Sequence, residues 1–358
     1  MKKLSLILLI AALLLTLLTG CASKTAETTP APEPSPTAAP NEPSAPESEE
    51  PSSAPEATSF RLATLKGPTT MGLVKLLQQS DAGQLSYTAE STIYGAADEI
   101  SALIIGGSVD IAAVPCNLAS ILYNKTEGAV QVIAINNLGV LNVLELGNEI
   151  SSIADLRGKT IYSTGKGTTP EYTLNAILRA NGLEPGTDVN IEYKAEATEI
   201  AALLAGDTAA PGTIAVLPQP YATTVLMQNP SARIALDLTQ EWTAAGLDGK
   251  LVTGVFVVRR DFAEQNPTLI SSFLTDYAAS ADWVNANTAE AAVLVAELGI
   301  VANPAVAQKA LPNCAIVALT GSEIKTDVSS YLTVLFDQNP QSVGGALPDA
   351  DFYYDAAA

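Results

Sequence analysis

Two glycine-containing loops, one hundred residues apart, constrain the fold of this chain more than any other feature. Residues 166–171 read Lys-Gly-Thr-Thr-Pro-Glu, between an apolar run and a periodic helical run, and residues 66–70 read Lys-Gly-Pro-Thr-Thr in the same setting. Thr168 and Glu171 fit a capping box, and Pro170 suits a first helical turn. Each loop therefore predicts a strand, a turn and a helix whose free N–H groups face an anionic or carbonyl-bearing ligand.

The duplication continues in the next unit along the chain. Residues 99–107 read Glu-Ile-Ser-Ala-Leu-Ile-Ile-Gly-Gly, and residues 199–207 read Glu-Ile-Ala-Ala-Leu-Leu-Ala-Gly-Asp. An apolar run that ends in proline follows each of them, at Pro115 and at Pro218. Common ancestry and convergence both account for this match. In either case it predicts two lobes of similar architecture that face one ligand.

Apolar runs alternate with helical patterns from Phe60 onward, which predicts parallel or mixed sheets covered by helices. About 300 residues follow this point, more than one core usually holds. The expected fold class is α/β with two lobes, each a mixed, mainly parallel sheet flanked by helices. We expect lobe 1 at residues 60–139 and 253–358, lobe 2 at 140–252, and the hinge at 139–142 and 252–254. Strands are expected at 62–65, 85–89, 110–114, 130–135, 139–146, 159–163, 189–193, 213–217, 234–238 and 253–258, and nearly continuous helix at 261–333.

The first 59 residues carry signals for export and attachment. Residues 1–20 combine two lysines with an apolar run, as in a secretory signal peptide. Leu-Thr-Gly-Cys at 18–21 resembles a bacterial lipobox, which predicts lipidation of Cys21; an ordinary signal with an incidental cysteine is the alternative. Residues 21–59 are rich in proline and glutamate and poor in large apolar residues, which predicts a disordered tether. We therefore expect an extracytoplasmic protein, lipid-anchored to the outer side of the bacterial cytoplasmic membrane.

Charge and composition exclude several classes of protein. The chain has 18 basic and 38 acidic residues, of which three lysines and seven glutamates precede Phe60. The remaining 15 and 31 give a net charge of −16, which argues against binding of nucleic acid. The chain has no histidine, which removes Ser-His-Asp and Cys-His pairs and most zinc sites. The loop at 166–171 also lacks the spacing of a nucleotide-binding P-loop. We expect no catalytic residue, no metal and no cofactor.

Ligands of open α/β sheets bind beyond the carboxyl ends of the strands, and this rule selects the candidate residues. Lysines in this set can pair with an anion, tyrosines can stack on a flat heterocycle, and amides suit a polar neutral ligand. Each type has an ordinary alternative: a solvated lysine, a core aromatic or a capping amide. The expected ligand-binding residues are Lys66, Thr69, Thr70, Tyr94, Pro115, Cys116, Asn117, Asn137, Gly165, Lys166, Gly167, Thr168, Thr169, Gln219 and Tyr221.

Asn136 also stands among the residues expected after the strands. Cys116 and Cys314 are expected either to form a disulfide or to stay free and buried, and both alternatives remain open.

These features together resemble the solute-binding proteins of ABC importers, and most closely the nitrate/sulfonate/taurine and thiamine-pyrimidine-precursor group. The resemblance rests on the lipobox, the tether, the Asp-Leu-Arg-Gly-Lys turn at 155–159 and the segment 206–218, and it covers residues 60–354. It implies a type II periplasmic-binding fold that closes on one small molecule and delivers it to an ABC permease and its ATPase. It also implies that the two glycine loops touch the ligand.

We expect a monomer that is not an enzyme. The alternatives are a ligand-sensing lipoprotein for a signalling partner and an extracytoplasmic enzyme on the same fold.

Overall fold

The computed structural model describes residues 58–206 and 209–355. The expected signal peptide 1–20, the lipidation site Cys21 and nearly all of the expected tether 21–59 lie outside these residues. Among the helices of the described segments, none is long and apolar enough to span a bilayer.

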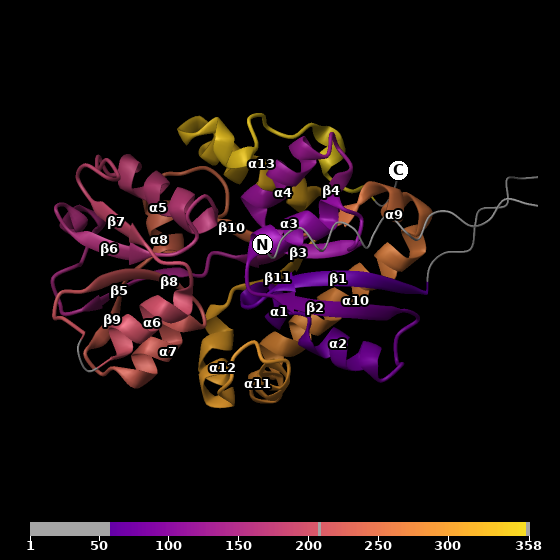
Figure 1. The fold of residues 1–358 in the computed structure, drawn as a ribbon, viewed down its shortest axis with the longest axis horizontal. Coiled ribbons are helices and arrows are strands. Elements are labelled where there is room, and N and C mark those ends of the chain that lie inside the picture. The colour runs from indigo at the N-terminus through magenta and orange to yellow at the C-terminus, as the bar shows by residue number, and fades with distance from the viewer. Residues whose placement is uncertain (1–57, 207–208, 356–358) are drawn as a thin grey trace, which may run out of the picture. The chain divides into compact units, whose positions relative to one another are not determined.

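Six strands form the first sheet in the order β11-β4-β10-β3-β1-β2 (Figure 1). β1 is parallel to β2 and β3, whereas β10 is antiparallel to both of its neighbours. Burial alternates at the start of β1, as expected for a strand with one face toward the core. The strands are β1 (Ser59–Leu65), β2 (Thr88–Tyr94), β3 (Ile111–Pro115), β4 (Val130–Leu138), β10 (Val252–Arg259) and β11 (Ile316–Leu319).

Helices cover both faces of this sheet. α2, α10 and α11 share one apolar core with it, and the long helix α10 buries residues spaced three or four apart, such as Phe273 and Tyr277. α3, α4 and α13 contribute to the core on the other face. The helical elements are α1 (Pro68–Met71), α2 (Val74–Asp81), α3 (Ala97–Ile105), α4 (Cys116–Lys125), α9 (Arg260–Gln265), α10 (Pro267–Ala286), α11 (Thr288–Glu297), α12 (Pro304–Ala310), η2 (Leu311–Asn313), α13 (Ser322–Gln338), η3 (Pro340–Val343) and η4 (Ala350–Phe352).

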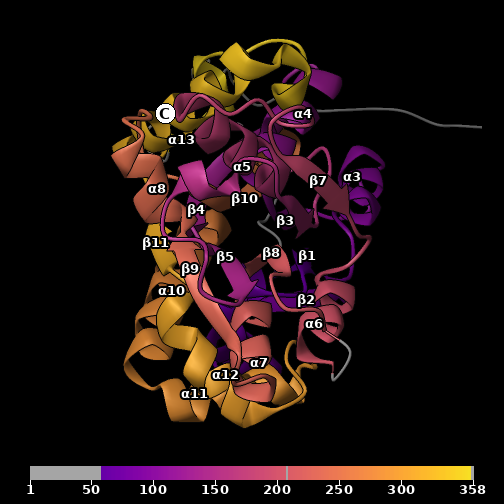
Figure 2. The same ribbon diagram turned by 90° about the vertical axis from the view of Figure 1, so that its left-hand side faces the viewer.

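Five strands form the second sheet in the order β7-β6-β8-β5-β9. β6 is parallel to β7 and β8, and β5 is antiparallel to β8 and β9. Figure 2 shows α5 and α8 on one face and α6 and α7 on the other. The elements are β5 (Leu141–Leu146), η1 (Ile153–Leu156), β6 (Thr160–Ser163), α5 (Thr169–Ala180), β7 (Asn190–Tyr193), α6 (Ala197–Ala205), β8 (Ile214–Pro218), α7 (Tyr221–Gln228), β9 (Ala232–Asp237) and α8 (Leu238–Ala244).

The repeated helix and strand of the sequence occupy matching places in the two sheets. α3 ends before Gly106 and leads to β3, which ends at Pro115, while α6 ends before Gly206 and leads to β8, which ends at Pro218. β3 and β8 each lie inside their sheet, between a parallel and an antiparallel neighbour. The expected α/β class with two helix-flanked mixed sheets is confirmed, but the sheets are not mainly parallel: three of the five strand pairs in the first sheet and two of the four in the second are antiparallel, because β10, β11 and β5 run against their neighbours.

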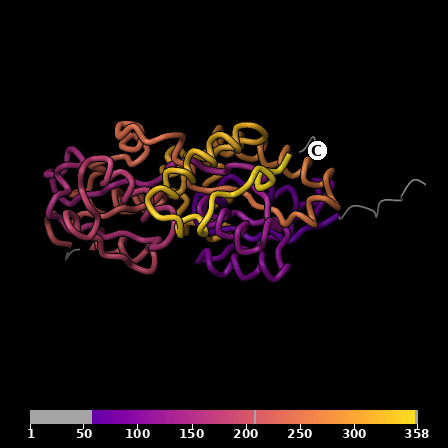
Figure 3. The backbone as a smooth tube through the Cα atoms, turned by 90° about the horizontal axis from the view of Figure 1, so that it is seen from above, coloured from indigo at the N-terminus to yellow at the C-terminus, as the bar shows by residue number. Residues whose placement is uncertain are grey.

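Helix α13, in the yellow segment of Figures 1 and 3, contacts β4 and β10 of the first sheet and α5, which covers the second sheet. Its Tyr331 hydroxyl lies 3.2 Å from Thr173 Oγ1 of α5, and the Tyr331 ring packs 5.5 Å from the ring of Trp242 in α8. Lys250 Nζ donates to Asp327 of α13 at 2.9 Å. α13 therefore joins the first sheet, through α4 and β4, to the helices of the second.

Two strand predictions were wrong, both at sheet edges. The strand expected at 85–89 is β2 at Thr88–Tyr94, whose side chains are mostly exposed or half-buried because β2 has a neighbour on one side only. The segment 261–333, expected to be nearly all helix, contains the four-residue edge strand β11. β2 lacks the apolar run that marks a central strand, whereas β11 is the apolar run Ile-Val-Ala-Leu but has only four residues and lies between helices.

The two cysteines outside the lipobox are free and buried, so they do not form a disulfide. Cys116 belongs to the core that contains α3, α4 and α13, and Cys314 belongs to the core on the opposite face of the sheet. Burial raises the pKa of Cys314 to about 12 and raises the pKa of Cys116 as well. Both thiols are therefore protonated at neutral pH and act as small apolar side chains.

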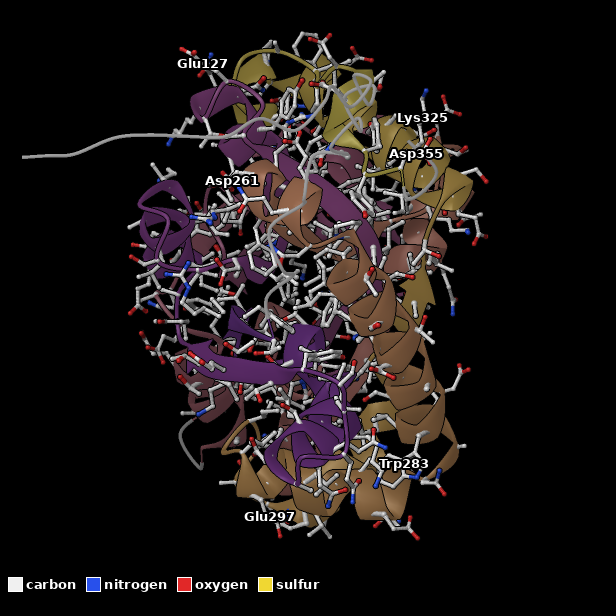
Figure 4. The ribbon with its side chains drawn as sticks, turned by 90° about the vertical axis from the view of Figure 1, so that its right-hand side faces the viewer. Glu127, Asp261, Trp283, Glu297, Lys325 and Asp355 are labelled. Carbon is white, nitrogen blue, oxygen red and sulfur yellow. The ribbon has the colours of Figure 1, made fainter. Side chains whose placement is uncertain are left out.

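A buried carboxylate at the start of β3 makes stability depend on pH. Burial opposes ionisation of Asp110, but hydrogen bonds from Arg61 and the charges of Arg61 and Arg259 lower its pKa overall. Figure 4 views this end of the molecule and labels Asp261, which lies 3.4 Å from Arg259. Because the folded pKa lies below the unfolded value of about 3.9, this stabilisation is complete above that pH and is lost as the pH falls toward the folded pKa.

We therefore expect Asp110→Asn to be less stable than the unsubstituted protein at pH 7 and to lose less stability between pH 5 and pH 3. The reason is that asparagine neither pairs with the guanidinium groups nor titrates. Urea unfolding across this range measures the difference. Parallel pH profiles for the two proteins would show that Asp110 does not contribute.

Candidate ligand-binding site

Strand ends of the first sheet converge on one edge, where β3, β4 and β10 meet. Gly254 near the start of β10 pairs with Pro115 at the end of β3 and with Asn137 near the end of β4. The chain leaves this edge for the second sheet after Leu138 and returns at Val252. Polar residues placed here lie where open α/β sheets bind ligands.

Three side chains surround Gly254, and we call Asn136, Asn137, Thr69 and Gly254 the Gly254 cluster. A Cβ atom at Gly254 would lie 2.2 Å from Asn137 Oδ1, 2.5 Å from Asn136 Oδ1 and 2.8 Å from Thr69 Cγ2. Gly254 is not in the left-handed region of φ, so its backbone conformation does not require glycine. Glycine is needed here because the side chains of Asn136, Asn137 and Thr69 lie where a Cβ atom would be. The two amide oxygens are therefore drawn together around a single backbone position.

The amides of the Gly254 cluster lack protein partners although they are buried. Asn136 is 0% exposed and Asn137 is 1% exposed. Within the described segments, Asn136 Nδ2, Asn136 Oδ1 and Asn137 Oδ1 have no hydrogen-bond partner, and Asn137 Nδ2 donates only to the adjacent carbonyl of Leu138 at 3.3 Å. The backbone carbonyl of Asn136 is held by the Tyr277 hydroxyl at 3.1 Å, which fixes the strand behind the amide. Buried amides normally have partners, so this cluster is a candidate binding site.

A second polar contact joins the start of α4, which packs on the first sheet, to the start of α5, which packs on the second. Asn117 is fully buried, and its Nδ2 donates to the carbonyls of Ser342 at 3.1 Å and Gly167 at 3.4 Å. Its Oδ1 accepts from Thr169 Oγ1 at 3.4 Å. The structure thus brings the predicted residues Asn117, Gly167 and Thr169 together, and they bind one another.

The glycine loop before α5 differs from the expected capping box. Glu171 Oε2 accepts from Gly167 N at 2.5 Å instead of from Thr168 N, and the Thr168 hydroxyl donates to Gly165 O at 2.8 Å. Gly165 and Gly167 adopt φ of 69° and 78°, and this left-handed backbone presents the Gly167 N–H to the helix's own carboxylate. The loop therefore carries a negative charge where the sequence suggested an anion-binding nest.

The two lysines of the glycine loops are both exposed. Lys66 follows β1, and its backbone N–H donates to Tyr94 O at the end of β2 at 2.9 Å. Lys166 Nζ lies over the ring of Tyr193, 5.8 Å from its centroid. Neither ammonium group has a hydrogen bond or an ion pair with the Gly254 cluster.

The remaining predicted residues are mostly engaged in local structure. The hydroxyls of Thr69 and Thr70 both donate to Leu65 O. Gln219 is buried, and its Oε1 accepts from the backbone and hydroxyl of Thr223, which secures the start of α7. Pro115 precedes α4 and Cys116 begins it, while Tyr94 and Tyr221 are half-buried against apolar cores.

A groove of about 630 Å³ runs along the crossing between the sheets at residues 139–142. Two of its polar side chains are already committed: Asp237 Oδ1 caps α8 by accepting from Thr239 N, and Asn142 Nδ2 donates to Val140 O at 3.2 Å. The buried atoms without a partner in the described residues include those of Asn136 and Asn137 and none of this groove's lining.

The sequence prediction included Asn137 in the site and Asn136 among its neighbours, but it treated Gly254 only as part of the hinge. The pairing of Gly254 with Asn137 joins residues more than one hundred positions apart. The one local signal was a glycine inside an apolar strand, which often marks close approach of another group.

Solved structures with the same fold include an ABC transporter protein from Parabacteroides distasonis, which is 25% identical over 83% of this chain and 99% of its own, with a TM-score of 0.69. The alkanesulfonate-binding protein SsuA of Xanthomonas axonopodis, bound to MOPS, is 18% identical over 83% of this chain and 96% of its own, with a TM-score of 0.63. The periplasmic aliphatic sulphonate-binding protein SsuA of Escherichia coli is 17% identical over 82% and 93%, with a TM-score of 0.64. A search of curated proteins gives no match.

The family model described as NMT1/THI5 like matches residues 99–291, from α3 to α11. This stretch is more than half of the chain and includes both sheet crossings. The family resemblance inferred from the sequence is confirmed: the chain belongs to the NMT1/THI5-like family and has the two-lobed fold of type II periplasmic-binding proteins.

Proposed function

We propose that this chain is the solute-binding component of an ABC importer, which captures one small molecule between two lobes and delivers it to a permease and its ATPase. The observation that carries the proposal is the pair of buried, unpartnered amides at Asn136 and Asn137. They lie at the edge where the chain crosses between the sheets, so a solute bound there is within reach of both lobes. The family and the solute-binding proteins among the structural neighbours support this choice over an enzyme.

The lobes that we propose are residues 60–139 with 253–358, and residues 140–252. The proposed binding residues are those of the Gly254 cluster, with Asn117, Gly167 and Thr169 forming the contact that closes over the solute. We further propose lipidation at Cys21, attachment to the outer side of the cytoplasmic membrane and action as a monomer. These three points rest on the sequence and on the family.

The proposal predicts that a solute draws the lobes together about the crossings at 139–142 and 252–254. We expect a compound that raises the melting temperature to lower the radius of gyration in small-angle X-ray scattering. The reason is that bridging contacts, such as the long 3.4 Å bond from Asn117 to Gly167, shorten when the lobes close.

The control for this experiment is a compound of similar size that does not raise the melting temperature, which should leave the scattering profile unchanged. Identical profiles with and without a stabilising compound would contradict capture by closure. Turnover of the bound compound, followed by mass spectrometry, would favour an enzyme on the same fold.

A further inference from the structure

The charge of the solute can be inferred from the groups that would meet it. We propose that the solute presents an uncharged carboxamide- or lactam-type edge to Asn136 and Asn137, and not an oxyanion. This inference rests on the proposed function, because it concerns the same site.

The first argument is the chemistry of the two unpartnered amides. Asn136 leaves both a donor and an acceptor without a partner, and Asn137 leaves an acceptor. Their complement is a group with an N–H beside a carbonyl, as in a carboxamide or a lactam. Turning the Asn136 amide by 180° only exchanges its donor and acceptor, so the same kind of complement is required. Turning the Asn137 amide would replace its donor to Leu138 O by an oxygen, so the orientation with Oδ1 unpartnered is favoured. An oxyanion has acceptors only and would leave the amide oxygens facing its negative oxygens.

The second argument is that, within the described residues, neither the arginines nor the two glycine-loop lysines are placed to balance an anion at Asn136 and Asn137. Each of the six arginines forms an ion pair with a carboxylate of the chain. Lys66 is exposed, and Lys166 is exposed with its ammonium over Tyr193. Moving an anion from water to Asn136 and Asn137, which are at most 1% exposed, is unfavourable without a positive partner.

The third argument concerns the helix α5, whose N-terminus faces the first sheet through Asn117. Two of its loop N–H groups are already used, because Gly167 N donates to the Glu171 carboxylate and Thr168 N donates to Gly165 O. An oxyanion at this position would compete with Glu171 and be repelled by it. A neutral edge meets no such repulsion.

The test compares neutral and anionic compounds built on the same skeleton. Nicotinamide is paired with nicotinate, benzamide with benzoate and butyramide with butyrate, 2-pyrrolidinone represents the lactams, and methanesulfonate and nitrate represent the oxyanions. Thermal shift identifies binders, calorimetry at ~50 mM and ~500 mM salt measures their affinity, and native mass spectrometry identifies any small molecule that copurifies with the protein. We expect the neutral member of a pair to bind at least ~100-fold more tightly than its anion, with affinity changing less than about twofold between the two salt concentrations.

A charge substitution adds a second readout. Asn136→Asp replaces an amide, which has a donor and an acceptor, by a carboxylate, which has acceptors only. It is expected to lower the affinity for the neutral compound at least about tenfold. Asn303→Asp is the matched control, because Asn303 caps the exposed start of α12 and aspartate caps equally well. It adds the same charge and should leave affinity unchanged.

Each outcome decides one of the two proposals. If methanesulfonate or nitrate binds and salt weakens that binding, the solute is not neutral, and the inference is wrong although solute binding is upheld. A sulfonate or other oxyanion that copurifies with the protein has the same meaning. If no compound stabilises the protein and no small molecule copurifies with it, the proposed function itself fails. Selective binding of the neutral members, lost in Asn136→Asp and kept in Asn303→Asp, supports the inference.

Discussion

Replacing Gly254 with alanine is expected to lower solute affinity about 100-fold or more while the protein stays folded. The added methyl group would lie 2.2 Å from Asn137 Oδ1 and 2.5 Å from Asn136 Oδ1, so both amides must move. Each hydrogen bond lost from a buried partner costs about 1–3 kcal/mol, and two such losses account for a factor of this size. Calorimetric titration with a stabilising compound from the neutral panel measures the change.

Gly95→Ala provides the matched control for this substitution. Gly95 follows β2, has no other atom within 4 Å of where its Cβ would lie and has no positive φ. It therefore accepts alanine without strain, and its affinity should match that of the unsubstituted protein. Overpacking at Gly254 is expected to cost about 1–3 kcal/mol of stability, which urea unfolding without solute checks. A Gly254→Ala protein that binds as tightly as the original would show that the solute does not reach this cluster.

The architecture was predictable because its signals are local and repeated. The apolar runs, the glycines after residues 105 and 205 and the prolines at 115 and 218 mark the same helix and strand in both lobes. The central strands β3 and β8 form where the apolar runs predict them, because a strand that is buried on both faces needs a continuous apolar run. The edge strand β2 was misplaced because most of its side chains are exposed and it carries no continuous apolar run, and β11, an apolar run of four residues between helices, was missed because it is too short to stand out from the helical pattern.

The site was less predictable because its geometry depends on pairing between distant strands. Asn137 could be proposed from its place near a strand end, but the role of Gly254 follows only from its pairing with Asn137 across β4 and β10. The glycine loop before α5 shows a different limit. Spacing identified Thr168 and Glu171 as partners, yet the positive φ values of Gly165 and Gly167 direct the carboxylate to the Gly167 N–H. The Gly167 N–H, which the spacing left free for an anion, is therefore paired with the carboxylate of Glu171 in the helix that follows.

A buried ion pair in the second sheet gives the largest stability effect that we expect. Glu145 of β5 is 1% exposed, and Arg233 Nη2 of β9 donates to its Oε2 at 2.6 Å. Arg233 Nε also donates to Gly147 O at 3.0 Å, while Glu145 Oε1 accepts from Glu149 N at 2.6 Å. The pair thus holds β5, β9 and the turn after β5 in one hydrogen-bonded unit.

Arg233→Leu is therefore expected to lower the free energy of unfolding by about 3–5 kcal/mol, because it leaves the Glu145 carboxylate buried without its cation. Urea unfolding at neutral pH measures the loss. Lys159→Leu is the control: it breaks a pair of the same 2.6 Å length with Glu149, but that carboxylate is 68% exposed, so the expected loss is below about 1 kcal/mol. The double substitution Glu145→Leu with Arg233→Leu should recover part of the stability, since no buried charge then remains. If Arg233→Leu costs no more than Lys159→Leu, burial of Glu145 does not set the strength of the pair, and water must reach the carboxylate as freely as it reaches Glu149.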